Sequence, residues 1–165
     1  MTQFREILLL LERGGVRFIL IGGVAAAVHG ASRSTRDVDV VYARDGENIR
    51  RLAAALAPHN PYLRGAPSGL PFRLDEKTIG LGLNFTLTTD LGDLDLLGEI
   101  AGGGQFDDLS THSTRVSIFG VSCACVDLPT LIRVKRAAGR PKDLEAIAEM
   151  EALLVERERR APPKA

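Results

Sequence analysis

The sequence is poor in aromatic residues and has no excess of charge. Aromatic side chains make up 5% of the 165 residues, and tryptophan is absent. Glycosidases also work with two carboxylates, but this chain offers little aromatic surface for stacking on sugars. Basic and acidic residues balance at 21 each. Net charge therefore gives no reason to expect a nucleic acid, a membrane surface or an acidic partner.

Cysteine is scarce as well. The only two, Cys123 and Cys125, stand two positions apart in a segment with the pattern of a strand, where side chains two apart share one face. No second Cys or His pair lies nearby to complete a zinc site. We therefore expect both to be buried small hydrophobic residues in a reducing compartment.

No apolar stretch is long enough to cross a membrane. The longest, residues 18–28, contains two glycines and falls well short of the roughly 20 residues that a spanning helix needs. The segment that opens the chain lacks the basic start and the small-residue cleavage site of a signal peptide. Hydrophobic residues make up 45% of the chain and charged residues 25%, as in ordinary globular domains. We expect a soluble, cytoplasmic protein without a membrane partner.

Apolar periodicity predicts the main elements. Helical spacing occurs at residues 4–13, 47–57, 129–138 and 141–156. Strand patterns occur at residues 16–21, 37–42, 83–89, 93–97, 115–119 and 121–126. A short Ala-rich helix is expected after Gly22 and Gly23, and residues 58–72 have the Pro- and Gly-rich composition of an irregular loop.

The order of these elements predicts the fold class. Helix, strand, helix and strand, followed by hairpins, indicate an α+β (mixed α/β) fold whose first two strands are central. The length suits one domain, which we expect over residues 1–157, with a disordered tail over residues 158–165.

Two pairs of carboxylates point to a metal site. Asp37 and Asp39 share one face of a predicted strand, and Asp93 and Asp95 repeat the pattern downstream. If the two strands are neighbours, the carboxylates converge and repel one another unless a divalent cation neutralises them. Oxygen ligands suit Mg²⁺ or Mn²⁺, and Mg²⁺ is commonly held together with substrate phosphates. A nucleoside triphosphate is therefore the predicted ligand.

Two further segments fit a phosphate ligand. Gly22 and Gly23 stand where a strand turns into a helix, so the backbone can approach a ligand closely and helix N–H groups can bind phosphate. The loop that follows adds hydroxyl and guanidinium groups at Ser32, Arg33, Ser34, Thr35 and Arg36. Near the C-terminus lies a basic cluster of Arg133, Lys135, Arg136, Arg140 and Lys142. That cluster is either a solvated helix face or a source of charge for phosphates.

In this order, the segments resemble the nucleotidyltransferase superfamily, whose pattern is a strand, Gly-Gly or Gly-Ser, a helix, h-D-h-D-h and a later h-D-h (h, hydrophobic). The chain is most similar to small nucleotidyltransferases related to AbiEii-type toxins of type IV toxin–antitoxin systems. Three blocks carry the resemblance: IGGVAAAVHGASRSTRDVDVV, LDLL and LIRVKRAAGRPKDLEAI.

The resemblance implies a nucleotidyltransferase fold, with a central mixed sheet, flanking helices and a C-terminal helical segment. It implies transfer of an NMP from an NTP to an acceptor hydroxyl with release of pyrophosphate, using two Mg²⁺ or Mn²⁺ ions. Asp37 and Asp39 correspond to the ligands of both metals, and Asp95 to the third carboxylate, although Asp93 faces the same way. The expected nucleotide-binding residues are Gly22, Gly23, Arg33, Thr35, Lys135, Arg140 and Lys142.

Other readings are weaker or stay open. A Rossmann site needs G-x-G-x-x-G and a P-loop needs G-x-x-x-x-G-K-[ST], and neither pattern is present. A non-catalytic relative that binds a nucleotide or a partner within a toxin–antitoxin pair is the main alternative. The acceptor can be tRNA, a small molecule or a protein, and a homodimer or a cognate protein partner can complete its site.

Overall fold

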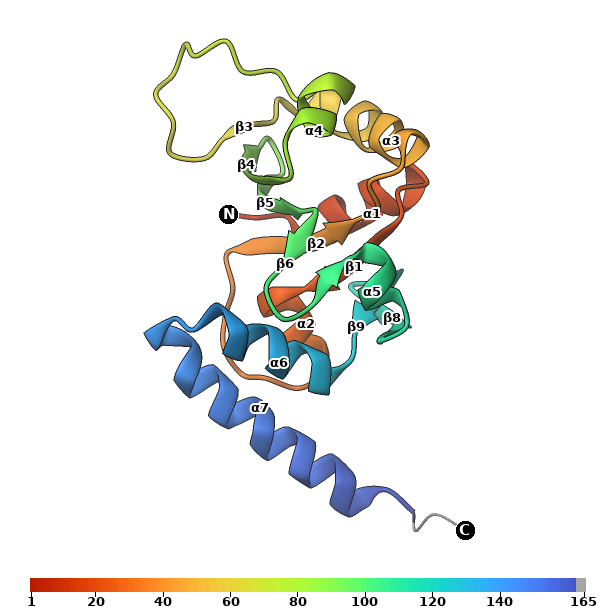
Figure 1. The fold of residues 1–165 in the computed structure, drawn as a ribbon, viewed down its shortest axis with the longest axis vertical. Helices are drawn as coiled ribbons and strands as arrows, with labels where there is room; N and C mark the ends of the chain where they lie inside the picture. Colours follow the sequence, from red (N-terminus) through yellow and green to blue (C-terminus); the bar gives the residue numbers. More distant parts are fainter. Residues whose placement is uncertain (163–165) are drawn as a thin grey trace.

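A seven-stranded mixed sheet is the centre of the fold in the computed structural model, which describes residues 1–162 (Figure 1). Its strands are β1 (Phe18–Ile21), β2 (Asp37–Tyr42), β3 (Tyr62–Leu63), β4 (Asn84–Thr89), β5 (Gly92–Leu97), β8 (Ser113–Ile118) and β9 (Val121–Val126). They are ordered β3-β4-β5-β2-β1-β9-β8, while β6 (Glu99–Ile100) and β7 (Gly104–Gln105) form a separate hairpin. The predicted central position of the first two strands is confirmed.

Helices flank the sheet, as the sequence predicts. They are α1 (Phe4–Arg13), α2 (Gly22–Val28), α3 (Gly46–Leu56), α4 (Glu76–Leu81), α5 (Phe106–Ser110), α6 (Leu128–Ala138) and α7 (Pro141–Arg160). The two C-terminal helices pack against each other, and α7 is the longest element of the described chain (Figure 1). The predicted mixed α+β class is therefore confirmed.

The structure differs from the sequence prediction mainly in residues 57–81. The predicted irregular loop contains a 3₁₀ turn, η1 (Ala57–His59), and the short strand β3, and α4 follows it. Elements of two to six residues are too short to show a periodic pattern, which explains why they were not predicted. At the other end, α7 continues through Arg160, so it includes part of the predicted tail, and residues 163–165 lie outside the described residues.

The pairing of β2 with β5 places the acidic residues on one face. The two strands are parallel, with Asp37 opposite Asp93 and Asp39 opposite Asp95. The alternate side chains, Val38, Val40, Leu94 and Leu96, are fully buried in the core. Because successive side chains alternate across a strand, burial of these four aliphatic residues turns all four carboxylates to the opposite face.

Both cysteines are core residues, as expected. Cys123 and Cys125 lie on β9, are buried and form no disulfide. Burial raises the pKa of Cys123 to about 11 and that of Cys125 to about 12, so neither thiol is reactive near neutral pH. Among residues 1–162, no helix has both the length and the hydrophobicity to cross a membrane.

Candidate active site

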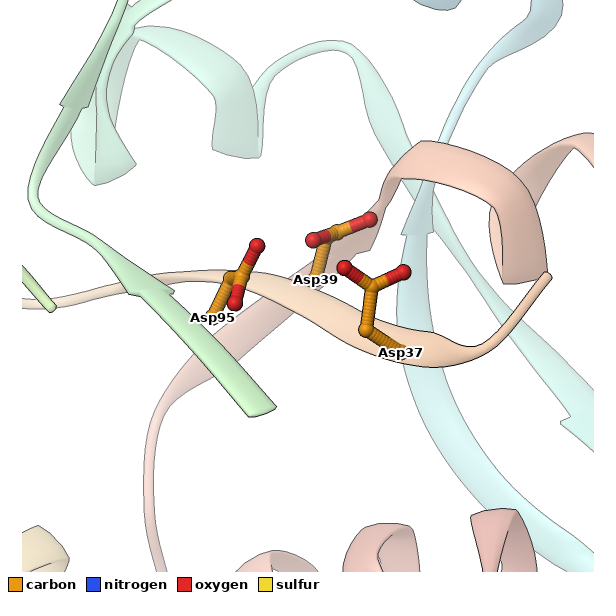
Figure 2. Close-up of side chains that lie close together, drawn as sticks. All are labelled: Asp37, Asp39 and Asp95. Atoms are coloured by element: carbon orange, nitrogen blue, oxygen red, sulfur yellow. The ribbon is translucent and has the colours of Figure 1, made fainter. Parts of the chain in front are cut away.

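Three carboxylates meet on the face of β2 and β5 that is turned away from Val38, Val40, Leu94 and Leu96. Asp37, Asp39 and Asp95 each offer an oxygen atom, and these atoms lie within 4.8 Å of one another. Figure 2 shows the three side chains pointing to the same side of the two strands. Their convergence follows from the parallel register, because Asp95 stands directly opposite Asp39, and Asp37 is two positions along the same strand.

Asp39, in the middle of this cluster, lies where its surroundings disfavour the ionised carboxylate. Burial, together with the charges of Asp37 and Asp95, raises the pKa of Asp39 to about 8. Burial also raises the pKa of Asp95, although a hydrogen bond from Asp39 and the charge of Arg64 oppose that effect. Without a cation, the pair formed by Asp39 and Asp95 therefore tends to retain a proton.

This perturbed pKa predicts how the stability of the metal-free protein depends on pH. The folded protein holds a proton on Asp39 up to about pH 8, whereas an unfolded chain releases it near pH 4. The free energy of unfolding should therefore fall as the pH rises from about 4 to about 8. We expect the melting temperature in EDTA to drop by at least about 3 °C between pH 5 and pH 8.

Thermal melts at several pH values with Asp39→Asn alongside would check this result. The variant cannot ionise at this position and should show a flatter profile. A wild-type melting temperature that is constant or rises over this interval would contradict the assignment.

Gly22 and Gly23 form the turn from β1 into α2, and both are closely packed. Gly22 has φ +69°, and a Cβ added there would overlap the carboxylate of Asp39. A Cβ at Gly23 would lie 2.6 Å from Cβ of Thr35. The two glycines therefore let the Asp39 and Thr35 side chains lie directly against the backbone of the turn.

Gly22→Ala should accordingly destabilise the protein. A left-handed backbone and a steric overlap with Asp39 act together, so we expect a loss of about 1–3 kcal/mol. Gly46→Ala is the matched control, because an added Cβ there meets no atom within 4 Å. Urea unfolding of both variants checks this prediction, and equal stability of the two would contradict it.

The loop between α2 and β2 is tied to both the carboxylates and α7. Oγ1 of Thr35 donates to the backbone and side-chain oxygens of Asp37, at 3.2 Å each. Arg33 forms an ion pair with Glu145. The backbone N–H and hydroxyl of Ser32 donate to Glu149, at 2.7 and 2.8 Å. These contacts hold the loop as one wall of the site.

A buried acid organises the basic residues on the opposite wall. Asp143 in the first turn of α7 is only 3% exposed and accepts a hydrogen bond of 2.8 Å from Nε of Arg140. Nζ of Lys135 on α6 lies 3.9 Å from the same carboxylate. Burial alone would raise the pKa of Asp143, but the hydrogen bond and charge of Arg140 and the charge of Lys135 outweigh it and lower the pKa. Lys135 also lies close enough to Asp39 to favour its ionised form.

These walls enclose a cleft of about 580 Å³. Every site residue predicted from the sequence lines it: Gly22, Gly23, Arg33, Thr35, Asp37, Asp39, Asp95, Lys135, Arg140 and Lys142. An apolar wall adds Leu97, Ile100, Leu131, Val134 and Ala138. The structure thus brings the predicted residues together, while the ligand they bind stays a prediction.

Sequence reasoning missed Arg64, the residue after β3. Its Nη2 lies 2.7 Å from Oδ1 of Asp95, its Nε 3.4 Å from Oδ2 of Asp93, and its Nη1 3.7 Å from Oδ2 of Asp37. Asp93 is therefore an ion-pair partner of Arg64, and it does not line the cleft. No sequence pattern marks Arg64, because the two-residue pairing of β3 with β4 places it.

Solved structures of known proteins share this fold, although no family model and no curated protein matches the sequence. The lincosamide antibiotic adenylyltransferase LnuA, solved with lincomycin bound, has a TM-score of 0.60 and 15% identity, covering 92% of this chain and 96% of that one. TM1012 of Thermotoga maritima, assigned as a nucleotidyltransferase, has a TM-score of 0.56 and 15% identity, covering 88% of each chain.

An antigenic nucleotidyltransferase-like protein from Paracoccidioides brasiliensis has a TM-score of 0.56 and 16% identity, covering 90% of this chain and 73% of that one. Identities this low establish the fold alone. The chain has the nucleotidyltransferase fold, as its sequence predicts.

Proposed function

We propose that this protein is a metal-dependent nucleotidyltransferase, which moves an NMP from an NTP to an acceptor hydroxyl and releases pyrophosphate. One observation carries the proposal. Asp37, Asp39 and Asp95 converge at a cleft whose opposite wall presents Lys135 and Arg140. Carboxylates facing cations across a cleft suit a ligand that combines divalent cations with phosphates.

The three carboxylates fit a divalent cation. They supply hard oxygen ligands, which Mg²⁺ and Mn²⁺ prefer. A bound cation would oppose the burial and the neighbouring negative charges that raise the pKa of Asp39. Asp37, Asp39 and Asp95 would together hold the metal ions. Bound there, two ions would neutralise charge on the attacking and leaving oxygens.

The chain's own groups would bind and orient the substrates. Lys135, Arg140 and Lys142 would bind the triphosphate, and the backbone at Gly22 and Gly23 would approach it closely. The apolar wall of Leu97, Ile100 and Val134 offers a surface for the base. The acceptor oxygen attacks the α-phosphorus, and Asp95 accepts the proton of the acceptor hydroxyl. The bond between the α-phosphorus and the oxygen that bridges the α- and β-phosphates breaks, and pyrophosphate leaves with that oxygen.

A small molecule that carries a hydroxyl group is the first acceptor to test. LnuA, with the same fold over most of both chains, is an adenylyltransferase of lincosamide antibiotics. Residues of a homodimer partner or of a cognate protein would complete the acceptor site. Transfer to tRNA or to a protein is the alternative that the same assay resolves.

The resemblance of three sequence blocks to AbiEii-type toxins favours a cellular role within a toxin–antitoxin pair. Under this proposal, expression of the active chain alone would slow growth, and a cognate partner would relieve the effect. A non-catalytic relative would slow growth equally with or without Asp39. Comparing wild type with Asp39→Asn in a growth assay therefore separates a catalytic toxin from a binding protein.

The test of the proposed function is release of pyrophosphate from each of the four NTPs. Reactions would contain Mg²⁺ or Mn²⁺ with bulk tRNA, a panel of hydroxyl-bearing small molecules including lincomycin, or protein as the acceptor. Release by wild type, lost on addition of EDTA and absent in Asp39→Asn, would establish the activity. Metal-dependent nucleotide binding without release would favour the non-catalytic relative, and absence of nucleotide binding would overturn the site.

A further inference from the structure

Arg64 occupies the acidic face of β2 and β5 as a cation supplied by the protein itself. Its guanidinium contacts three carboxylates, Asp95 most closely, and Nη2 also donates to the carbonyl oxygen of Leu87 at 2.7 Å. Its backbone N–H donates to the carbonyl oxygen of Thr86 at 3.0 Å. The residue is thus anchored to β4 while its charged end lies among the carboxylates.

Arg64 is the main source of compensating charge for these acids. Within residues 1–162, the ion pairs of Asp37, Asp93 and Asp95 are all made with Arg64. Its side chain is 28% exposed, so solvent screens these contacts only in part. A half-buried guanidinium shared among three carboxylates offsets part of their mutual repulsion.

The observed position leaves one nitrogen of the Arg64 guanidinium group without a hydrogen bond. The Nε atom is the one buried side-chain nitrogen or oxygen in the described residues without a hydrogen-bond partner. The Oδ2 atom of Asp93 lies 3.4 Å from it but does not satisfy hydrogen-bond geometry. Buried polar atoms are rarely left unpaired. A shift of the guanidinium toward Asp93 would give Nε a hydrogen-bond partner.

Asp93 and Asp95 therefore offer Arg64 two alternative partners on one strand. Asp95 belongs to the triad that converges for a metal, whereas Asp93 does not. A divalent cation at the triad and the guanidinium at Asp95 compete for the same carboxylate, since Nη2 already lies 2.7 Å from Oδ1. Both positive charges cannot hold Asp95 closely without repelling each other.

We propose that the guanidinium of Arg64 takes the place of a metal ion at Asp95 and balances its charge when no metal is bound. When a divalent cation binds at Asp95, the guanidinium moves to Asp93. This inference rests on the metal site of the proposed function. It assigns Asp93 the role of retaining Arg64, and it implies that Arg64 weakens the binding of the metal. The Leu87 carbonyl keeps the guanidinium close to the site in both states.

Calorimetric titration of Mn²⁺, without nucleotide or acceptor, tests the proposal. Arg64→Gln removes the competing charge and should lower the Kd for Mn²⁺ by at least about tenfold relative to wild type. Arg73→Gln is the matched control, because Arg73 is an exposed residue of the same loop, and the ion pairs of Asp37, Asp93 and Asp95 among the described residues are made with Arg64 instead. An unchanged or higher Kd in Arg64→Gln would overturn the inference, as would absence of Mn²⁺ binding in both proteins.

Thermal melts provide the second measurement. In EDTA, Arg64→Gln should melt below wild type, because the carboxylates lose their compensating charge. Mn²⁺ should then raise its melting temperature by more than it raises that of wild type, and an equal or smaller rise would count against the proposal. If Arg64→Gln does not fold, Arg64→Lys replaces it. A lysine cannot contact two carboxylates with separate nitrogens, so a Kd lowered by a smaller factor is expected, and an unchanged Kd overturns the inference.

The outcomes for this inference and for the proposed function are separable. If wild type transfers nucleotide while Arg64→Gln binds Mn²⁺ no more tightly than wild type, the inference fails and the function stands. If Arg64→Gln binds Mn²⁺ more tightly while no NTP is consumed with any acceptor, the inference stands and the function fails.

Discussion

Replacing Asp39 by asparagine should lower the rate of nucleotidyl transfer by at least about 100-fold. Loss of a residue that only supports a metal ligand usually costs about 10–100-fold, and loss of a ligand's charge should cost at least as much. Asp39 stands at the centre of the triad, opposite Asp95 and two positions from Asp37. An amide oxygen carries no negative charge, so the proposed ions would lose part of the charge that holds them. At pH 8 without metal, the same substitution should raise the melting temperature, because it removes the carboxylate whose ionisation is most opposed by its surroundings.

Opposite effects on activity and stability make this prediction specific. Steady-state rates of pyrophosphate release and melts in EDTA would be measured on the same preparations. Asp107→Asn, an exposed carboxylate of α5 outside the cleft, serves as the control and should change neither quantity. Activity within about threefold of wild type in Asp39→Asn would remove Asp39 from the proposed metal site, and a large loss of stability would point to a structural role.

Asp95→Asn should reduce activity by at least about 100-fold, whereas Asp93→Asn should reduce it by less than about tenfold. Both side chains lie on the same face of β5, and only Asp95 comes within reach of both Asp37 and Asp39. Asp93 pairs with Arg64 at the side of the cluster. Its loss would disturb Arg64 without removing a metal ligand.

The pair of variants is its own control, because each removes one negative charge from the same strand. Values of kcat and KM at several Mg²⁺ concentrations would separate loss of a ligand from a general loss of negative potential. If Asp93→Asn proved the more damaging variant, the third ligand would be Asp93, and the role of Arg64 would have to be reassigned.

Local rules were sufficient to predict which face of β2 each side chain occupies. Alternation along a strand places Asp37 and Asp39 on one face whatever the rest of the fold does, and burial of Val38 and Val40 confirms the face that is turned away. The predicted convergence of the four carboxylates depended on β2 and β5 being neighbours, and the sequence did not establish that they are. Pairing between distant strands depends on packing across the whole sheet, which a short pattern does not encode.

The surroundings of Arg64 and Gly22 could not be predicted from local patterns, because they depend on contacts between distant segments. Arg64 lies in a Pro- and Gly-rich segment without periodicity, and its position depends on one short strand at the sheet edge. The turn at Gly22 was predicted as a place where a ligand approaches the backbone. The structure adds that Asp39 itself approaches it, so substitution there would affect the carboxylate cluster whether or not a ligand binds.

The parallel pairing of β2 with β5 also has a consequence for how the protein folds. Parallel neighbours require a long crossover, and here α3, η1, β3, α4 and β4 all intervene along the chain. Contacts between residues so far apart in sequence form slowly, because loop closure precedes any gain from pairing. During synthesis, Asp37 and Asp39 leave the ribosome well before Asp95, so no early fragment of the chain can assemble the cluster. The chemistry of this site becomes available only when the sheet is nearly complete.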